Sequence, residues 1–161
     1  SQLSLATAQI VNGGRKLEPN VFFRENKKKP KLPILLAAQN HLKIISNAMV
    51  EATNNPKGTS YRSRIIGENK MGGKTGTSQV RAISAKEREE GIIKNKDLPW
   101  NKRDHGLFIG FGPLKSPKYA VSVIIEHGGS GSSSAAPIAS KVLKFLFSQK
   151  LGLKRKKIIN V

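Results

Sequence analysis

The chain has 161 residues and no cysteine, which excludes disulfides, thiolate metal sites and cysteine nucleophiles. A hydrophobic content of 37% is enough for a packed core, and the length allows one domain or a large part of one. No apolar run approaches the ~20 residues that a membrane-spanning helix needs. The three histidines lie far apart in the sequence, so we expect neither a metal nor another cofactor.

The formal net charge is +19, from 29 Lys and Arg residues against 10 Asp and Glu residues. A field of this sign attracts polyanions, which makes a basic nucleic-acid-binding module one alternative function. The charges are spread along the chain, however, and the densest clusters lie at 27–31 and 154–157. No aromatic residues alternate with them to stack on bases. We therefore favour a lysine-rich solvated surface and expect no nucleic-acid partner.

Two helices are predicted in the first third of the chain. In the first, Leu3, Ala6 and Ile10 share one helical face, and Asn12-Gly13-Gly14 is expected to end the helix with left-handed backbone. The second is predicted by five apolar residues at three- and four-residue spacing, which would form one buried stripe: Ala38, Leu42, Ile45, Met49 and Ala52.

Three strands and a closing helix are predicted in the rest of the chain. The strands are expected at 74–80, 107–111 and 119–126, the last two joined by a hairpin loop and covered on both faces. The closing helix is expected to begin near Pro137, a residue type favoured in the first helical turn. Helices followed by antiparallel strands and a final helix indicate an α+β fold.

The segment 81–104 separates the first two predicted strands and is highly charged. Apart from one possible helical turn at 85–90, it shows no regular pattern. Long excursions of this kind are often functional, and we expect a mobile flap beside or over a cleft. We assign residues 1–151, including this flap, to part of a single domain, and residues 152–161 to a basic tail.

The string Gly73-Lys74-Thr75-Gly76-Thr77-Ser78 is compatible with two kinds of site. A P-loop requires a glycine five positions before Gly73, where this chain has Glu68, and it must open a helix. The second kind is the Lys-Thr-Gly box of penicillin-binding proteins and serine β-lactamases. That box lies on an edge strand, and its glycine lets a substrate approach the backbone.

Further blocks in the same order make the resemblance specific. They are Gly58-Thr59-Ser60-Tyr61-Arg62, Met71 to Val80, Asp104 to Phe111, Tyr119 to Val123, Glu126 to Gly131 and Ala135 to Ala139. In order and spacing the chain resembles the class B penicillin-binding proteins from Ser1 to about Leu146, most of all the penicillin-binding protein 2 group that serves cell elongation. The resemblance implies the C-terminal portion of their transpeptidase fold, an antiparallel sheet with flanking helices.

The family also uses a nucleophilic serine in an S-x-x-K box and a separate S-x-N box. This chain contains neither, and Ser78-Gln79-Val80-Arg81 is the nearest approach to the first. Both boxes precede the Lys-Thr-Gly strand in the family. We therefore expect that the chain is cut from a longer protein, and that this portion alone is inactive.

The resemblance implies a serine-type peptidoglycan D,D-transpeptidase that binds stem peptides and β-lactams. Lys74 would supply positive potential, Thr75 and Thr77 would offer hydroxyls to a carboxylate, and Gly76 would admit the substrate. The backbone N–H of Thr77 would form half of the oxyanion hole. A glycan polymerase and cell-elongation proteins are the expected partners. An inner-membrane location, with the catalytic domain in the periplasm and the anchor upstream of this chain, is also expected.

Other polar residues are interpreted as structural. Asp104 and His105 are adjacent on a predicted strand, so their side chains should point to opposite faces rather than form an acid–base pair. His127 is interpreted in the same way, and His41 is placed on the exposed side of its helix. The glycine-rich segment 128–134 is expected to connect the last strand to the closing helix.

Overall fold

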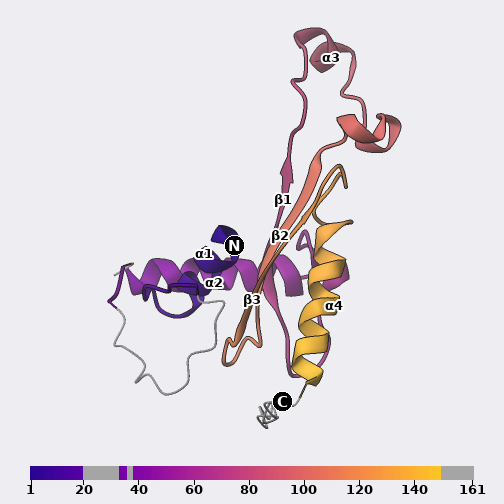
Figure 1. The fold of residues 1–161 in the computed structure, drawn as a ribbon. Coiled ribbons are helices and arrows are strands. Elements are labelled where there is room, and N and C mark those ends of the chain that lie inside the picture. Colours follow the sequence, from indigo (N-terminus) through magenta and orange to yellow (C-terminus); the bar gives the residue numbers. More distant parts are fainter. Residues whose placement is uncertain (20–32, 36–37, 150–161) are drawn as a thin grey trace, which may run out of the picture.

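A computed structural model describes residues 1–19, 33–35 and 38–149 (Figure 1). The two densest basic clusters and the proposed tail 152–161 lie outside the described residues. Within them, no helix is long and apolar enough to cross a membrane.

The centre of the fold is an antiparallel three-stranded sheet in the order β1-β2-β3. Its strands are β1 (Gly72–Ser78), β2 (His105–Gly112) and β3 (Tyr119–Ile125). All three predicted strands are therefore present, with ends that differ by up to two residues. The predicted hairpin between the last two strands is confirmed, because Gly112 lies opposite Tyr119 in the ladder.

Helices cover the sheet from both sides (Figure 1). Helix α4 (Ala135–Ser148) packs against β2 and β3, while α1 (Gln2–Val11) contacts β2 and β3 and α2 (Gln39–Asn54) contacts β1. The arrangement explains why β2 is apolar on both faces. The fold is α+β, as predicted.

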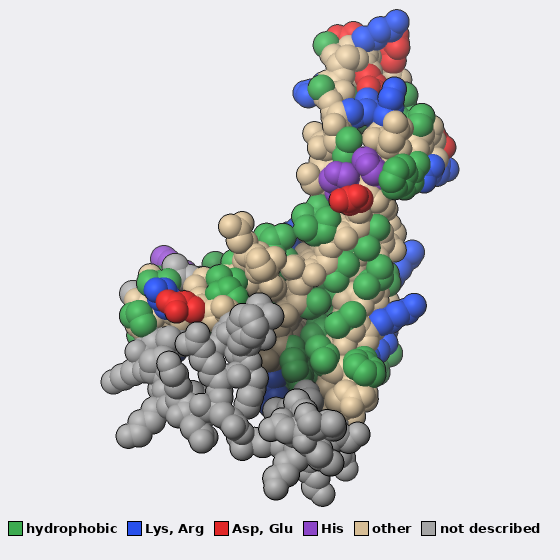
Figure 2. Space-filling view, in the orientation of Figure 1, with side chains coloured by type: hydrophobic (Ala, Val, Ile, Leu, Met, Phe, Trp, Pro, Cys, Tyr) green, Lys and Arg blue, Asp and Glu red, His purple; other side chains and the backbone are tan. Residues whose placement is uncertain are grey.

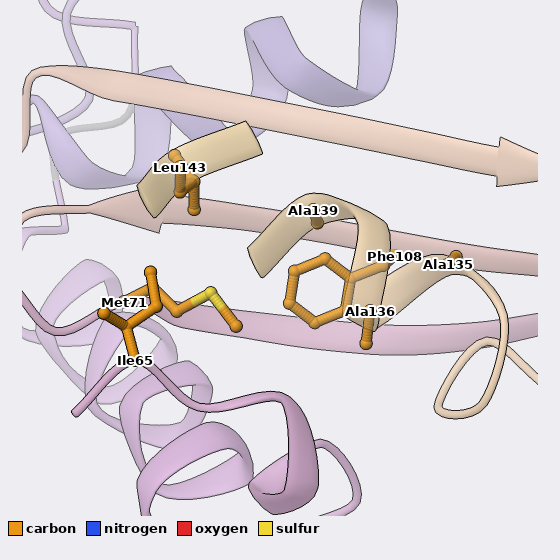
Figure 3. Close-up of a cluster of buried hydrophobic side chains, with 7 residues drawn as sticks. All are labelled: Ile65, Met71, Phe108, Ala135, Ala136, Ala139 and Leu143. Carbon is orange, nitrogen blue, oxygen red and sulfur yellow. The ribbon is translucent and has the colours of Figure 1, made fainter. Parts of the chain in front are cut away.

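The main core lies between α4 and the sheet (Figure 3). Phe108 of β2 is 1% exposed and points at the small side chains of α4. The buried cluster consists of Ile65, Met71, Phe108, Ala135, Ala136, Ala139 and Leu143. Alanines on the inner face of α4 bring the helix close enough to the sheet for the phenyl ring to be fully enclosed.

Two of the predicted helix faces are partly wrong. In α2, Leu42 and Met49 are buried, but Ile45 is 44% exposed and Ala38 is exposed. The helix instead buries Thr53, whose hydroxyl donates to the carbonyl of Met49 at 3.2 Å.

In α1 the only buried residue is Thr7, while Leu3 and Ala6 are exposed. The Thr7 hydroxyl donates to the carbonyl of Leu3 at 2.8 Å, so a polar group is buried with its hydrogen bond satisfied. Gly13 and Gly14 follow with φ of 83° and 76°, which confirms the predicted left-handed end of this helix.

The flap between β1 and β2 projects beyond the sheet and the covering helices (Figure 1). It contains the predicted helical turn, α3 (Ala85–Glu90), and two short 3₁₀ helices, η2 (Asn95–Asp97) and η3 (Trp100–Lys102). Another 3₁₀ turn, η1 (Tyr61–Ser63), lies earlier in the chain beside α4.

The flap is organised by its own ion pair rather than by the core. The guanidinium of Arg81 donates two hydrogen bonds to the carboxylate of Glu87, at 2.6 and 2.5 Å. Hydrogen bonding to Arg81 lowers the pKa of Glu87 to about 2. The same carboxylate accepts from the backbone N–H of Ile93, and Ser84 caps α3 by accepting from the Glu87 N–H. One carboxylate thus joins both sides of the flap tip.

Candidate active site

The predicted site residues lie on β1, which is an edge strand. Its only partner among the described residues is β2, so one side of the strand is open. A groove of about 860 Å³ lies over one face of the sheet and is lined by α2, by the loop that follows it and by the paired residues Lys74 and Ile109. Lys74 and Ile109 line the groove from the sheet, facing Ile44, Ile45 and Ala48 on α2.

Lys74 is exposed and belongs to the wall of this groove. Its Nζ donates to the carbonyl of Thr75 at 2.5 Å, which folds the ammonium group back along the strand. No acidic residue within the described ranges pairs with it. The positive charge is therefore available to an anionic ligand in the groove.

The two predicted threonines differ in their surroundings. Thr75 is half-buried, and its hydroxyl donates to Oγ1 of Thr59 at 3.1 Å. Thr77 is exposed and lies opposite Gly106 in the ladder. The sequence analysis gave no role to Thr59, although this residue lies within one of the blocks that carry the family resemblance.

The loop after α2 fixes the position of Thr59. A side chain at Gly58 would place its Cβ 2.4 Å from the carbonyl oxygen of Ala52, so only glycine fits there. On the other side, Ser60 donates its N–H and its hydroxyl to that same Ala52 carbonyl, each at 3.0 Å. Thr59 is therefore held beside Thr75 between two residues that are locked onto the end of α2.

Of the three glycines in β1, Gly76 is the one at which the described fold has room for a side chain. A Cβ added there would meet only the Cβ of Leu107, at 3.4 Å. At Gly73 an added Cβ would lie 2.2 Å from the ring of Phe108, and at Gly72 it would lie 2.8 Å from that of Phe111. Gly72 and Gly73 are thus required by the core, whereas the described fold leaves room at Gly76.

The segment 128–134 connects β3 to α4, as predicted, and crosses the site strand. A Cβ at Gly131 would lie 2.3 Å from the carbonyl oxygen of Gly76 and 2.1 Å from that of Leu107. Glycine is therefore needed at 131 for the connection to pack directly on β1 and β2.

Asp104 and His105 form no acid–base pair. The carboxylate of Asp104 accepts from the side-chain amide of Asn95 at 2.9 Å, while Nδ1 of His105 accepts from the backbone N–H of His127 at 2.8 Å. Nδ1 of His127 lies 2.9 Å from the carbonyl of Arg103, and its ring meets Trp100 edge-on. These contacts hold the base of the flap, in agreement with the structural role inferred from the sequence. His41 is exposed, as expected.

The geometry of the Lys-Thr-Gly segment rules out the P-loop alternative. A P-loop bends around phosphates and then opens a helix, but residues 72–78 form one continuous strand. No group of three or more metal-ligating side chains occurs among the described residues. The chemistry available at this strand is a cation, hydroxyls and open backbone beside a groove, which suits recognition of an anionic, extended ligand.

Comparison with known families gives a match over nearly the whole described chain. Residues 1–144 match the family described as the penicillin binding protein transpeptidase domain. Peptidoglycan D,D-transpeptidase MrdA of Salmonella typhimurium is 31% identical over 155 residues, which is 91% of this chain and 24% of that protein. The MrdA protein of Acinetobacter baumannii is 31% identical over 150 residues, covering 85% of this chain and 21% of the relative.

Solved structures agree with the sequence comparison. Penicillin-binding protein 2 of Pseudomonas aeruginosa, in complex with WCK 5153, superposes with a TM-score of 0.71 and 26% identity, covering 94% of this chain and 31% of that one. Penicillin-binding protein 2 of Helicobacter pylori, in complex with MreC, superposes with a TM-score of 0.69 and 28% identity. The match covers 89% of this chain and 23% of that one. This chain spans about a quarter of the length of the first curated relative. It therefore belongs to the penicillin-binding protein transpeptidase family, as a C-terminal portion of a domain like that of penicillin-binding protein 2.

Proposed function

We propose that this chain forms one wall of the active site of a peptidoglycan D,D-transpeptidase. The observation that carries the proposal is the Lys74-Thr75-Gly76 segment on an open edge strand, beside a groove, within a family match that covers residues 1–144. The reaction is acyl transfer between peptide stems through an acyl-serine intermediate.

In the proposed reaction, a serine contributed by the remainder of the protein attacks the carbonyl of the penultimate D-alanine. The C–N bond to the terminal D-alanine breaks, and that residue leaves with a proton on its amine. An amine of a second stem then attacks the ester carbonyl, which forms the cross-link and regenerates the serine. A β-lactam acylates the same serine when its ring amide opens.

The residues of β1 take complementary roles in this scheme. Lys74 provides positive potential and takes part in the proton-transfer network, while the hydroxyls of Thr75 and Thr77 bind the terminal carboxylate. The backbone N–H of Thr77 stabilises the oxyanion, a contribution of roughly 3–4 kcal/mol for one donor in other acyl-transfer enzymes. The space at Gly76 supports this scheme, because a substrate backbone needs that space and the described fold does not.

Thr59 is added to the site as a positioning residue. Its Oγ1 accepts from the Thr75 hydroxyl at 3.1 Å and so directs that donor. A hydroxyl donates only one hydrogen bond at a time. When a carboxylate binds, the Thr75 hydroxyl can therefore turn its proton from Oγ1 of Thr59 to the carboxylate.

Replacing Lys74 by alanine in the complete natural protein tests the proposal. We expect acylation by a fluorescent penicillin to slow by about 10²–10³-fold, the scale seen when one transition-state-stabilising group is lost. The melting temperature should hardly change, because Lys74 is exposed. The matched control is Lys70→Ala, which removes an exposed lysine just before β1. Acylation of the Lys74 variant at the rate of this control would refute the assignment.

The 161-residue chain alone should form no covalent adduct with the same penicillin. No serine in it is followed three positions later by a lysine that could activate it. A gel of the chain after incubation, with the complete protein as the positive control, measures this directly. A stoichiometric, serine-linked adduct would place the nucleophile inside this chain and overturn the mechanism.

The wider context also belongs to the proposal. Stem peptides and β-lactams are the ligands, and a glycan polymerase and elongation proteins are the partners. The complex of the Helicobacter pylori relative with MreC supports a partner of the second kind. We place the complete protein in the inner membrane, with this portion in the periplasm.

A further inference from the structure

We infer that a second pocket, between η1 and α4, binds a phosphate group. Four cationic side chains and several serines surround this pocket, whose volume is about 370 Å³. Its lining consists of Arg62, Ser63, Arg64, Ser132, Ser133, Pro137, Ser140, Lys141 and Lys144. The pocket does not include β1, and the inference does not rest on the transpeptidase function proposed above.

The cations in this pocket lack counter-charges. Among the described residues no carboxylate lies within 4.0 Å of the two arginines or the two lysines, and no acidic side chain lines the pocket. Lys and Arg side chains also gather along the outer side of α4 in Figure 2. Four like charges around one concavity repel one another, and an anion bound between them relieves that repulsion.

Two of the serines that line the pocket belong to largely buried residues. Ser63 and Ser140 are 8% and 4% exposed, and both line the pocket. Among the described residues, no buried side-chain oxygen or nitrogen lacks a hydrogen-bond partner. A serine hydroxyl that borders a pocket can donate one hydrogen bond to an anion inside it, so both serines can supplement the four cations.

The pocket is also held rigid. The guanidinium of Arg64 stacks over the ring of Tyr61 at 3.8 Å and donates to its backbone carbonyl at 3.1 Å, which fixes the direction of the remaining N–H groups. Ile65, the residue after Arg64, and Leu143, the residue before Lys144, both belong to the main core. The cationic residues of the η1 segment and of α4 are therefore next to residues that are packed in the core, rather than on loose loops.

These features favour phosphate over a carboxylate. A carboxylate carries one charge and two oxygens, whereas phosphate carries up to two charges and four oxygens that accept hydrogen bonds. Arginine forks and lysine ammonium groups are the side chains that bind phosphate most often, and serine hydroxyls supplement them. Inorganic phosphate and the headgroup of an anionic lipid share this chemistry.

The test is calorimetric titration of the 161-residue chain with inorganic phosphate at constant ionic strength. The variant Lys141→Gln/Lys144→Gln removes two charges from the pocket, and Lys115→Gln/Lys118→Gln removes two exposed charges from the β2–β3 hairpin. We expect affinity to fall at least about tenfold in the first variant and less than about twofold in the second. The variant Ser140→Ala should bind about threefold more weakly. Melting temperatures confirm that each variant is folded.

A second arm separates the two sources of phosphate. Vesicles of phosphatidylglycerol and of phosphatidylcholine are mixed with the chain, with and without inorganic phosphate. The ligand is a lipid headgroup if the chain binds the anionic vesicles, the pocket variant does not, and inorganic phosphate competes with the vesicles. The ligand is the free ion if the pocket variant binds the vesicles as well as the original chain does. The proposal fails if phosphate binding does not saturate. It also fails if the pocket and hairpin variants lose affinity equally, because the general positive field would then explain the binding.

Discussion

Glycine occurs three times in β1, twice at the end that packs on the core and once at the open end. Gly72 and Gly73 face the rings of Phe111 and Phe108, which leave no space for a side chain, whereas Gly76 has free space beside it. The same residue type thus serves packing at one end of the strand and, in our proposal, ligand access at the other. The difference continues beyond β1, where the packed end joins the helices and the open end leads into the flap (Figure 1).

Hydrogen exchange should show the largest contrast between the two ends. The flap makes its hydrogen bonds mainly within itself, while β3 is paired with β2 and packed under α4. Local opening of such projections costs much less than global unfolding, so we expect flap amides at 81–104 to exchange at least about 100-fold faster than those of β3. Equal protection would mean that the flap opens only when the whole domain unfolds.

Replacing Gly73 by alanine should destabilise the chain by about 1–3 kcal/mol, because the new methyl group overlaps the ring of Phe108. Denaturant unfolding of the two proteins measures the difference. Gly67→Ala is not a suitable control, since Gly67 has a φ of 106°. The better reference is Gly76→Ala on the same strand, and equal destabilisation by the two substitutions would remove the distinction between the ends of β1.

The ion pair at the flap tip should be visible in a carboxyl titration. The folded pKa of Glu87 lies near 2, below its ordinary value, so the pair stabilises the folded flap fully above about pH 4.3 and loses that effect as the pH falls toward 2. In Arg81→Gln the pKa of Glu87 should rise toward its ordinary value in an NMR titration. Lys86→Gln removes a neighbouring charge without touching this hydrogen bond, and should leave the pKa almost unchanged. A Glu87 pKa that stays near 2 in Arg81→Gln would show that another group causes the shift.

The smallest effect is expected from Gly76→Ala on stability. Its Cβ meets one side chain at ordinary contact distance, so the free energy of unfolding should change by less than about 0.5 kcal/mol. In the complete protein, penicillin acylation should nevertheless slow clearly, because the methyl group enters the space proposed for the substrate backbone. Normal acylation in this variant would show that the substrate does not approach Gly76.

Much of this architecture could be predicted from the sequence, because alternation and ordered motif blocks identify strands well. The strands, the hairpin, α3 and the C-terminal helix were all found within a few residues of their observed bounds. The buried side of α2 was found only in part. Periodicity marks apolar sides of a helix but not which of them is covered, and Ile45 lies toward the groove rather than in the core.

Two features of the site and flap left no readable signal in the sequence. The contact between Thr59 and Thr75 joins residues sixteen positions apart through a tight loop, and no local pattern marks such a pair. The link between Arg81 and Glu87 has a spacing of six, which matches neither helix nor strand geometry. Both depend on where loops place side chains, and loop geometry is set by packing such as that of Gly58 on Ala52.

The register of the β1–β2 ladder bears on how this part of the molecule can change over time. Ser78 lies directly opposite His105, so the two strands remain aligned up to the point where the flap begins. Loop closure becomes only about 0.6 kcal/mol more costly with each doubling of loop length. Insertions and deletions in the flap should therefore leave the alignment of Lys74 with Ile109 intact. Natural variation can change the length and shape of the flap while the strand that carries Lys74 keeps its place in the sheet.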